Sequence, residues 1–171
     1  MPKDSFLPDG IRCFSALLLR RPAAFARIRG SDEYPEIHGE IRFYETLPGV
    51  LAAARISGLP TSDNPCEKRI FAFHIHSGGR CSGNDMDPFA GAMTHDNPEN
   101  CAHPAHAGDL PPLFGNNGRA AAAVLTDRFT VREILGKTVI VHANRDDFTT
   151  RPSGDAGTKI ACGEIMRFGV W

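Results

Sequence analysis

Apolar and polar residues alternate with a period of two along much of the chain, which predicts short strands with one buried face. In residues 37–44, Ile37, Ile41 and Phe43 alternate with polar residues such as His38. The same pattern predicts strands at 50–56, 70–76, 120–125, 137–142 and 159–165, and an added edge strand at 25–29. Short strands between turn signals predict an all-β fold, a sandwich or barrel of antiparallel strands.

Two long segments, 77–117 and 143–157, have no such period and are rich in Gly, Pro, Asn and Asp. Loops of this length in a compact domain are usually functional. Thr130 and Glu133 have the spacing of a capping box, which predicts one helical turn over 130–135. Residues 1–24 lack periodicity and predict a loosely structured N-terminal arm, so we expect the folded domain to span 25–171.

The charge balance, 19 basic against 20 acidic residues, gives a net charge of −1. Such a chain is a poor candidate for broad binding to nucleic acid or acidic membranes. The apolar stretch from Cys13 to Leu19 is too short to span a bilayer, and its flanking arginines do not suit a signal peptide. We therefore expect a cytoplasmic protein with neither a membrane nor a nucleic acid as partner.

Five cysteines are present without a CxxC pair, which argues against a zinc ribbon and a thioredoxin-like site. Cys13 is interpreted as a free thiol on the arm. Cys66 and Cys101 flank the histidine-rich region, and the sequence leaves open whether they are free or form a disulfide.

Six of the seven histidines fall between residues 74 and 142. His74 and His76 are two apart on a predicted strand, so both rings leave the same face, while Phe71, Phe73 and Ile75 form the core face. His142 likewise lies opposite the core residues of its strand. We expect these imidazoles to project from the outside of the sheet, beneath the long loops.

The first loop adds four close-spaced residues of types that suit zinc: His95, His103, His106 and Asp109. A lone His-x-His is more often a pair of solvated polar residues than a metal site. His38 is likewise interpreted as a solvated residue on its strand. The joint pattern is more specific, because seven donors satisfy two four-coordinate metals if one imidazole bridges them.

These residues resemble the copper/zinc superoxide dismutase family. The resemblance runs from Ile37 to Ile165 and is carried by Phe73-His74-Ile75-His76, Gly78 to Cys81, His95-Asp96-Asn97-Pro98, His106-Ala-Gly-Asp109-Leu110, Val141-His142 and Gly157 to Gly163. It implies an eight-stranded Greek-key β-barrel with two functional loops and a superoxide dismutase that uses one copper and one zinc ion per subunit. A homodimer is compatible with it.

The resemblance also implies a role for each site residue. Copper would be bound by His74, His76, His95 and His142, and zinc by His95, His103, His106 and Asp109. His95 would bridge the two metals and carry a proton during turnover. Asp146 would link ligands of both metals, and Cys81 and Cys162 would form the family disulfide.

The chain departs from the family pattern in its short zinc loop and at Lys159, where an arginine commonly holds the anionic substrate. Lysine keeps the charge but lacks the planar fork of arginine. We expect Lys159, Arg145 and Arg151 to attract superoxide, so that Arg151→Glu and Lys159→Glu slow the reaction and flatten its salt dependence. The alternative function, a copper/zinc-binding protein without turnover, would be favoured by a missing copper ligand.

Overall fold

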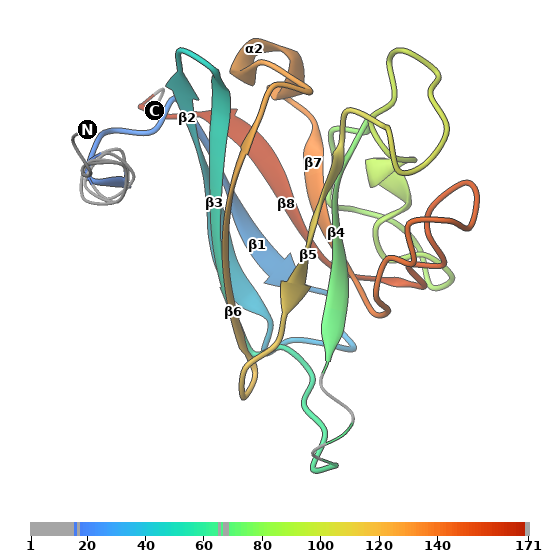
Figure 1. Cartoon of the computed structure of the whole chain (residues 1–171). Coiled ribbons are helices and arrows are strands. Elements are labelled where there is room, and N and C mark those ends of the chain that lie inside the picture. The colour runs from blue at the N-terminus through green and yellow to red at the C-terminus, as the bar shows by residue number, and fades with distance from the viewer. Residues whose placement is uncertain (1–15, 17, 65, 67–68, 170–171) are drawn as a thin grey trace, which may run out of the picture.

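A computed structural model describes residues 16, 18–64, 66 and 69–169. Most of the expected arm, Cys13 included, lies outside these residues. Eight strands form one antiparallel sheet that curls into a nearly closed barrel (Figure 1). The strands are β1 (Ala24–Gly30), β2 (His38–Thr46), β3 (Gly49–Ser57), β4 (Ile70–His76), β5 (Asp109–Phe114), β6 (Arg119–Thr126), β7 (Thr138–His142) and β8 (Lys159–Arg167). The all-β prediction is confirmed.

Hydrogen-bonded neighbours follow the order β5-β4-β7-β8-β1-β2-β3-β6. The chain therefore crosses the barrel between β3 and β4 and again between β6 and β7, as in a Greek key. Strands β5 and β6 lie side by side at the seam (Figure 1), and no backbone ladder joins them within the described residues. Among those residues, no helix is long and apolar enough to cross a membrane.

Two expectations about strands were wrong. Residues 25–29 belong to β1, which is not an edge strand: it pairs with β2 on one side and β8 on the other. The first long loop also contains β5, which Pro111 and Pro112 conceal in the sequence because proline has no N–H to donate to a ladder. The strand tolerates them because it lies at the seam, with β4 as its one ladder partner among the described residues, and because its register with β4 shifts between Phe71 and Phe73.

The barrel interior is filled by alternate residues of the strands, as the period of two predicts. Phe71, Phe73 and Ile75 of β4 point inward, together with Val139 and Val141 of β7. A second, small cluster lies outside the barrel, where Phe89, Ala92, Ile140 and Cys162 pack together. The long loop after β4 thus packs its apolar side chains on the outer face of the sheet. Other side chains on that face are buried beneath the loop.

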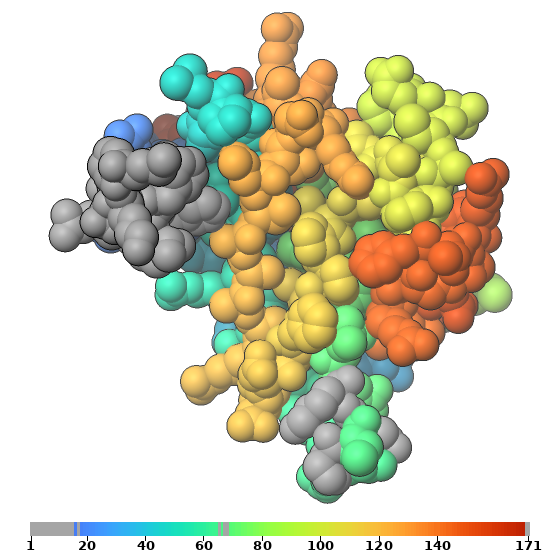
Figure 2. Space-filling view, viewed as in Figure 1, coloured from blue at the N-terminus to red at the C-terminus, as the bar shows by residue number. Residues whose placement is uncertain are grey.

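The two long loops lie against each other on one side of the barrel, over β4 and β7 (Figures 1 and 2). The first includes a short 3-10 turn, η1 (Ala90–Ala92), and precedes β5. The predicted helical turn is α2 (Val131–Ile134), and its Thr130 and Glu133 form the expected capping box.

Candidate metal centre

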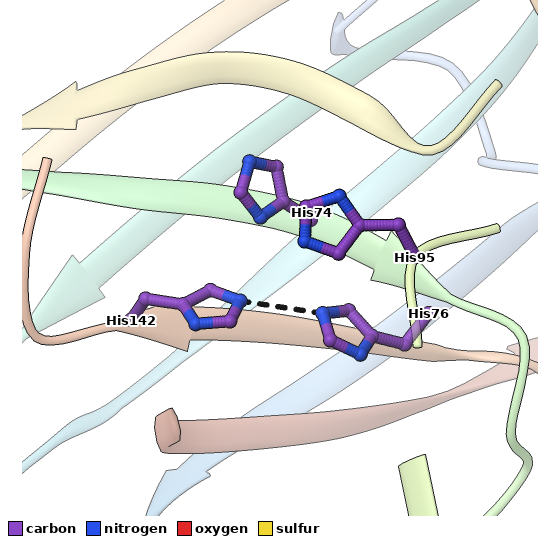
Figure 3. Close-up of side chains that lie close together, drawn as sticks. All are labelled: His74, His76, His95 and His142. Carbon is purple, nitrogen blue, oxygen red and sulfur yellow. Dashed lines mark hydrogen bonds between the residues drawn. The ribbon is translucent and has the colours of Figure 1, made fainter. Parts of the chain in front are cut away.

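Four histidines converge on the outer face of β4 and β7, beneath the loops (Figure 3). His74 and His76 stand on β4, His142 ends β7, and His95 comes from the first loop. One ring nitrogen of each lies within 4.8 Å of the others, and all four side chains are buried. We call His74, His76, His95 and His142 the copper group.

Backbone carbonyls set the orientation of two of these rings. His76 Nδ1 donates to the carbonyl of Met93 at 3.0 Å, and His142 Nδ1 donates to that of Gly157 at 3.2 Å. A carbonyl only accepts, so a neutral ring carries its proton on Nδ1 and has a free lone pair on Nε2. The two Nε2 atoms then face each other at 3.2 Å (Figure 3), an arrangement that a shared cation would stabilise.

Burial keeps these rings neutral. Desolvation, followed by the neighbouring histidines, lowers the pKa of His76 from 6.5 to about 2. The same causes lower the pKa of His142 to about 3. Neutral imidazoles are the form that ligates metals, so no proton must leave these two rings before they bind one.

The other two members of the copper group present a nitrogen with no hydrogen-bond partner among the described residues. These atoms are His74 Nδ1 and His95 Nε2, and both are buried. A buried polar atom without a hydrogen-bond partner destabilises the folded protein, and a bound metal would remove this cost. The donor set is entirely imidazole, which suits copper and zinc.

A second group, which we call the zinc group, joins His95, His103, His106 and Asp109, again within 4.8 Å and buried. The carboxylate of Asp109 lies at its centre: Oδ1 is 2.9 Å from His95 Nδ1, and Oδ2 is 3.1 Å from His103 Nδ1 and 3.3 Å from His106 Nδ1. Burial raises the pKa of Asp109, but the hydrogen bond from His95 and the nearby histidines outweigh it and lower the pKa. Three imidazoles and a carboxylate suit a tetrahedral zinc ion.

Asp146 connects the two groups from outside. Its Oδ2 accepts from His74 Nε2 at 2.7 Å, and its Oδ1 accepts from His103 Nε2 at 2.9 Å and from the Phe148 N–H at 2.7 Å. These hydrogen bonds outweigh burial and lower the pKa of Asp146. An ionised Asp146 holds a proton on each Nε2, and it thereby leaves Nδ1 of both rings facing its own group.

The backbone of Gly154 closes over this carboxylate. A Cβ at Gly154 would overlap Asp146 Oδ1 and would lie 2.7 Å from His103 Nε2. Only glycine fits this position, and no pattern in the sequence pointed to it.

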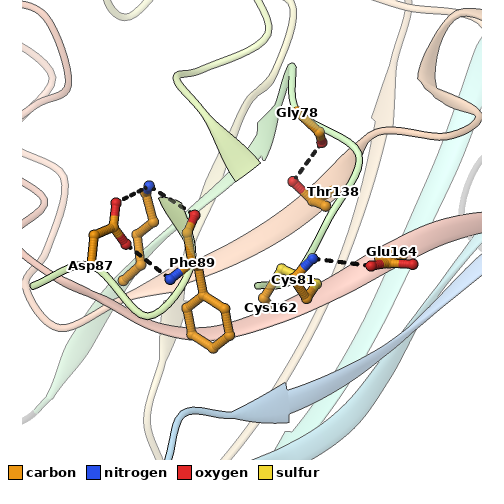
Figure 4. Close-up of a disulfide and its surroundings, with 8 residues drawn as sticks. Gly78, Cys81, Asp87, Phe89, Thr138, Cys162 and Glu164 are labelled. Carbon is orange, nitrogen blue, oxygen red and sulfur yellow. Dashed lines mark hydrogen bonds and ion pairs between the residues drawn. A yellow bond between two sulfur atoms is a disulfide. The ribbon is translucent and has the colours of Figure 1, made fainter. Parts of the chain in front are cut away.

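Lys159, which was expected to attract superoxide, is paired with a carboxylate of the first loop. Its ammonium donates to Asp87 Oδ2 at 2.7 Å and to the Phe89 carbonyl at 3.1 Å. Figure 4 shows Asp87 and Phe89 in the loop beside the disulfide. The other two cations that were expected to attract superoxide, Arg145 and Arg151, are exposed. Lys159 starts β8 opposite His142, so its positive charge lies close to the copper group. Asp87 partly neutralises this charge.

Cys81 and Cys162 form the disulfide that the resemblance implied (Figure 4). It ties the first loop to β8 and closes a sequence separation of 81 residues, which stabilises the fold by roughly 3–5 kcal/mol in the chain-entropy model. Cys66 and Cys101 are free and exposed, so the second disulfide left open by the sequence does not form.

Two cations that support the loop were missed in the sequence. Lys137 donates to Asp96 Oδ1 at 2.6 Å, next to His95, and Arg128 donates to carbonyls of the zinc-group loop. The partner of Lys137 is 41 residues away and those of Arg128 are 19, 22 and 24 residues away, so no local pattern marks them. His38, in contrast, is exposed on β2 as expected.

Comparison with known proteins agrees with this geometry. The family model described as copper/zinc superoxide dismutase matches residues 37–165. The chain is 31% identical to Cu-Zn superoxide dismutase 2 of Aquifex aeolicus over 76% of its length and 80% of the relative, and 29% identical to the Cu-Zn enzyme of Legionella pneumophila over 96% and 99%. Its fold is similar to that of the Cu/Zn superoxide dismutase from Brucella abortus, with a TM-score of 0.69 and 23% identity over 82% of this chain and 98% of that one.

Proposed function

The chain belongs to the copper/zinc superoxide dismutase family, and from this membership we propose that it converts superoxide to oxygen and hydrogen peroxide at one copper ion, beside one zinc ion. The observation that supports this most strongly is the convergence of four buried imidazole nitrogens, one of them from a ring that also belongs to the zinc group.

The copper group would bind through His74 Nδ1 and through Nε2 of His76, His95 and His142. The zinc group would bind through Nδ1 of His95, His103 and His106 and through the Asp109 carboxylate. The hydrogen bonds of His74, His76 and His142 leave their copper-facing nitrogens available, and His95 Nε2 and His103 Nδ1 have no hydrogen-bond partner among the described residues. In the zinc group, His95 Nδ1 and His106 Nδ1 lie 2.9 Å and 3.3 Å from the carboxylate of Asp109, with which they would share the ion. Copper, when bound, supplies the one-electron redox change that the reaction needs, whereas zinc has no second oxidation state and serves structure.

His95 is the residue best placed to move a proton. Its Nδ1 is held on the Asp109 side, and its Nε2 points into the copper group without a partner among the described residues. When His95 Nε2 is not ligating copper it can hold a proton, which it could pass to the departing peroxide, and Asp109 would keep the ring in place.

Lys159 would draw the anionic substrate toward the copper group. Its charge is fixed at the start of β8 by the Phe89 carbonyl, and Asp87 weakens the field that an approaching anion experiences. Arg145 and Arg151 are exposed on the second loop and would add positive potential there.

A metal-binding protein without turnover would be favoured by loss of a copper ligand, and all four members of the copper group are present and buried. The cytoplasmic location stays a prediction from the sequence, and a homodimer stays compatible with the family resemblance.

The test is elemental analysis of protein loaded with copper and zinc, with superoxide consumption measured on the same sample. We expect one ion of each metal per chain and rapid turnover. His142→Ala should lose copper and activity, while His38→Ala, which changes an exposed histidine on β2, should keep both. Zinc alone, or both metals without turnover, would contradict the proposal.

A further inference from the structure

The zinc-group loop has little regular structure to hold it. Between Asn97 and Asp109 the chain forms no strand. The Gly108 carbonyl accepts from the Ile75 N–H of β4 at 2.8 Å, which fixes the end of the segment, whereas the backbone before it is held by turns such as that from the Ala105 N–H to the Ala102 carbonyl at 2.8 Å. Three zinc-group residues must nevertheless meet within this segment. The part of the segment around His103 and His106 therefore depends on side-chain contacts from outside it, of which the hydrogen bond between His103 and Asp146 is one.

Arg128 makes such a contact. Its Nη1 lies 3.0 Å from the carbonyl oxygen of Pro104, 3.3 Å from that of His106 and 3.4 Å from that of Asp109. One NH₂ group has two hydrogens, so the short bond to Pro104 takes one of them and the two longer contacts share the other. The three carbonyls span the loop from the neighbour of His103 to the last zinc-group residue.

The backbone of Arg128 is itself firmly placed. It follows β6, and its N–H donates to Thr126 Oγ1 at 3.2 Å. The next residue, Phe129, is buried in the barrel core against Phe43, and Thr130 then begins the capped helix α2. The guanidinium thus extends from a rigid part of the barrel to the loop.

We infer that Arg128 is a positioning residue that holds the zinc-group loop in its metal-binding shape, an inference that rests on the proposed zinc site. Its charge alone would act in the opposite direction, because a guanidinium close to the site repels a divalent cation. Removing that charge would tighten zinc binding if electrostatics dominated. Removing the hydrogen bonds would loosen it if positioning dominates, so the sign of the change identifies the role.

The experiment follows zinc retention over time in excess chelator, by elemental analysis of copper- and zinc-loaded protein. Arg128→Met keeps most of the side-chain volume but loses the charge and the hydrogen-bond donors. We expect zinc to leave this variant about tenfold faster than wild type, which is at the low end of the effects seen when a supporting contact of a metal site is removed. Arg128→Lys keeps the charge and part of the donor set and should fall between Met and wild type. Arg132→Met, an equivalent change at an exposed arginine on α2, should retain zinc as wild type does.

Copper retention, measured in the same samples, separates positioning from general loss of stability. We expect it to change much less than zinc retention, since Arg128 contacts none of the strand residues of the copper group. Unchanged or slower zinc loss in Arg128→Met, or equal loss of both metals, would overturn the inference. If Arg128→Met does not fold, Arg128→Lys carries the test. Failure of wild type to bind zinc would refute the proposed site instead.

Discussion

Replacing Asp87 by asparagine should accelerate the reaction at low ionic strength. Asp87 Oδ2 accepts from Lys159 Nζ at 2.7 Å, and Oδ1 accepts from the Phe89 N–H at 3.0 Å. The substituted amide can keep the second bond, so the loop retains its shape, but it removes the negative charge beside Lys159. The lysine is left with the Phe89 carbonyl as its partner and with its full field directed at the approaching anion.

The size of the effect follows from Coulomb's law. For an anion about 10 Å from the removed charge, the interaction in water is about 0.4 kcal/mol before screening. Screening at 0.01 M salt leaves about 0.3 kcal/mol, or a rate about 1.7-fold higher, and screening at 0.15 M reduces the gain to about 1.2-fold. Lys159→Gln should change the rate in the opposite direction, because it leaves Asp87 unpaired.

The assay is kcat/KM for superoxide as a function of ionic strength, on samples with matched copper content. Asp63→Asn is the control, since it removes the same charge from an exposed residue in the β3–β4 connection. A slower Asp87→Asn enzyme would mean that Asp87 holds Lys159 in its working position instead of weakening it. A rate equal to that of the control variant at every salt concentration would remove this pair from the steering mechanism.

Two other perturbations test the metal centre itself. Gly154→Ala and Gly136→Ala both place alanine at positive φ, +68° and +78°, but a Cβ at Gly154 overlaps Asp146 whereas one at Gly136 meets nothing within 4 Å. Both should lose about 1–2 kcal/mol of stability to backbone strain, and only Gly154→Ala should also lose metal, as elemental analysis would show; equal metal content in the two variants would contradict this role of Gly154. In metal-free protein, His76 and His142 have folded pKa values of about 2 and about 3, so below pH 6.5 the unfolded chain binds more protons and the free energy of unfolding falls as the pH drops. Urea unfolding between pH 7 and pH 4 should show a slope approaching 2.7 kcal/mol per pH unit from these two rings, roughly halved in His142→Gln, and no difference between the two proteins would refute it.

Much of the barrel could be predicted because strand patterning is local. The alternation in residues 70–76 assigned Phe71, Phe73 and Ile75 to the core and both histidines to the outer face, as the structure has them. The same reasoning misplaced β1 at an edge, because alternation shows which face of a strand is buried but not which strands flank it. It missed β5 because the two prolines in that segment argue against a strand that is paired on both sides. A strand at the seam can contain them, but the sequence does not show where the seam lies.

The residues of the copper and zinc groups were recognisable as candidate ligands for a different reason: their chemical types are restrictive, and several of them lie close together in the chain. What the sequence could not supply is the partner of each charge. Lys159 was expected to attract superoxide because of its position and charge, but its field also depends on Asp87. Asp87 is 72 residues away in the chain and reaches Lys159 because the disulfide and the cluster around Phe89 hold the first loop on β8. Arg128 was overlooked for the same reason, since its partners are carbonyls that any residue type provides. Side chains that must ligate a metal are therefore visible in a sequence, whereas side chains that tune or support a metal site become visible only when the loops are folded.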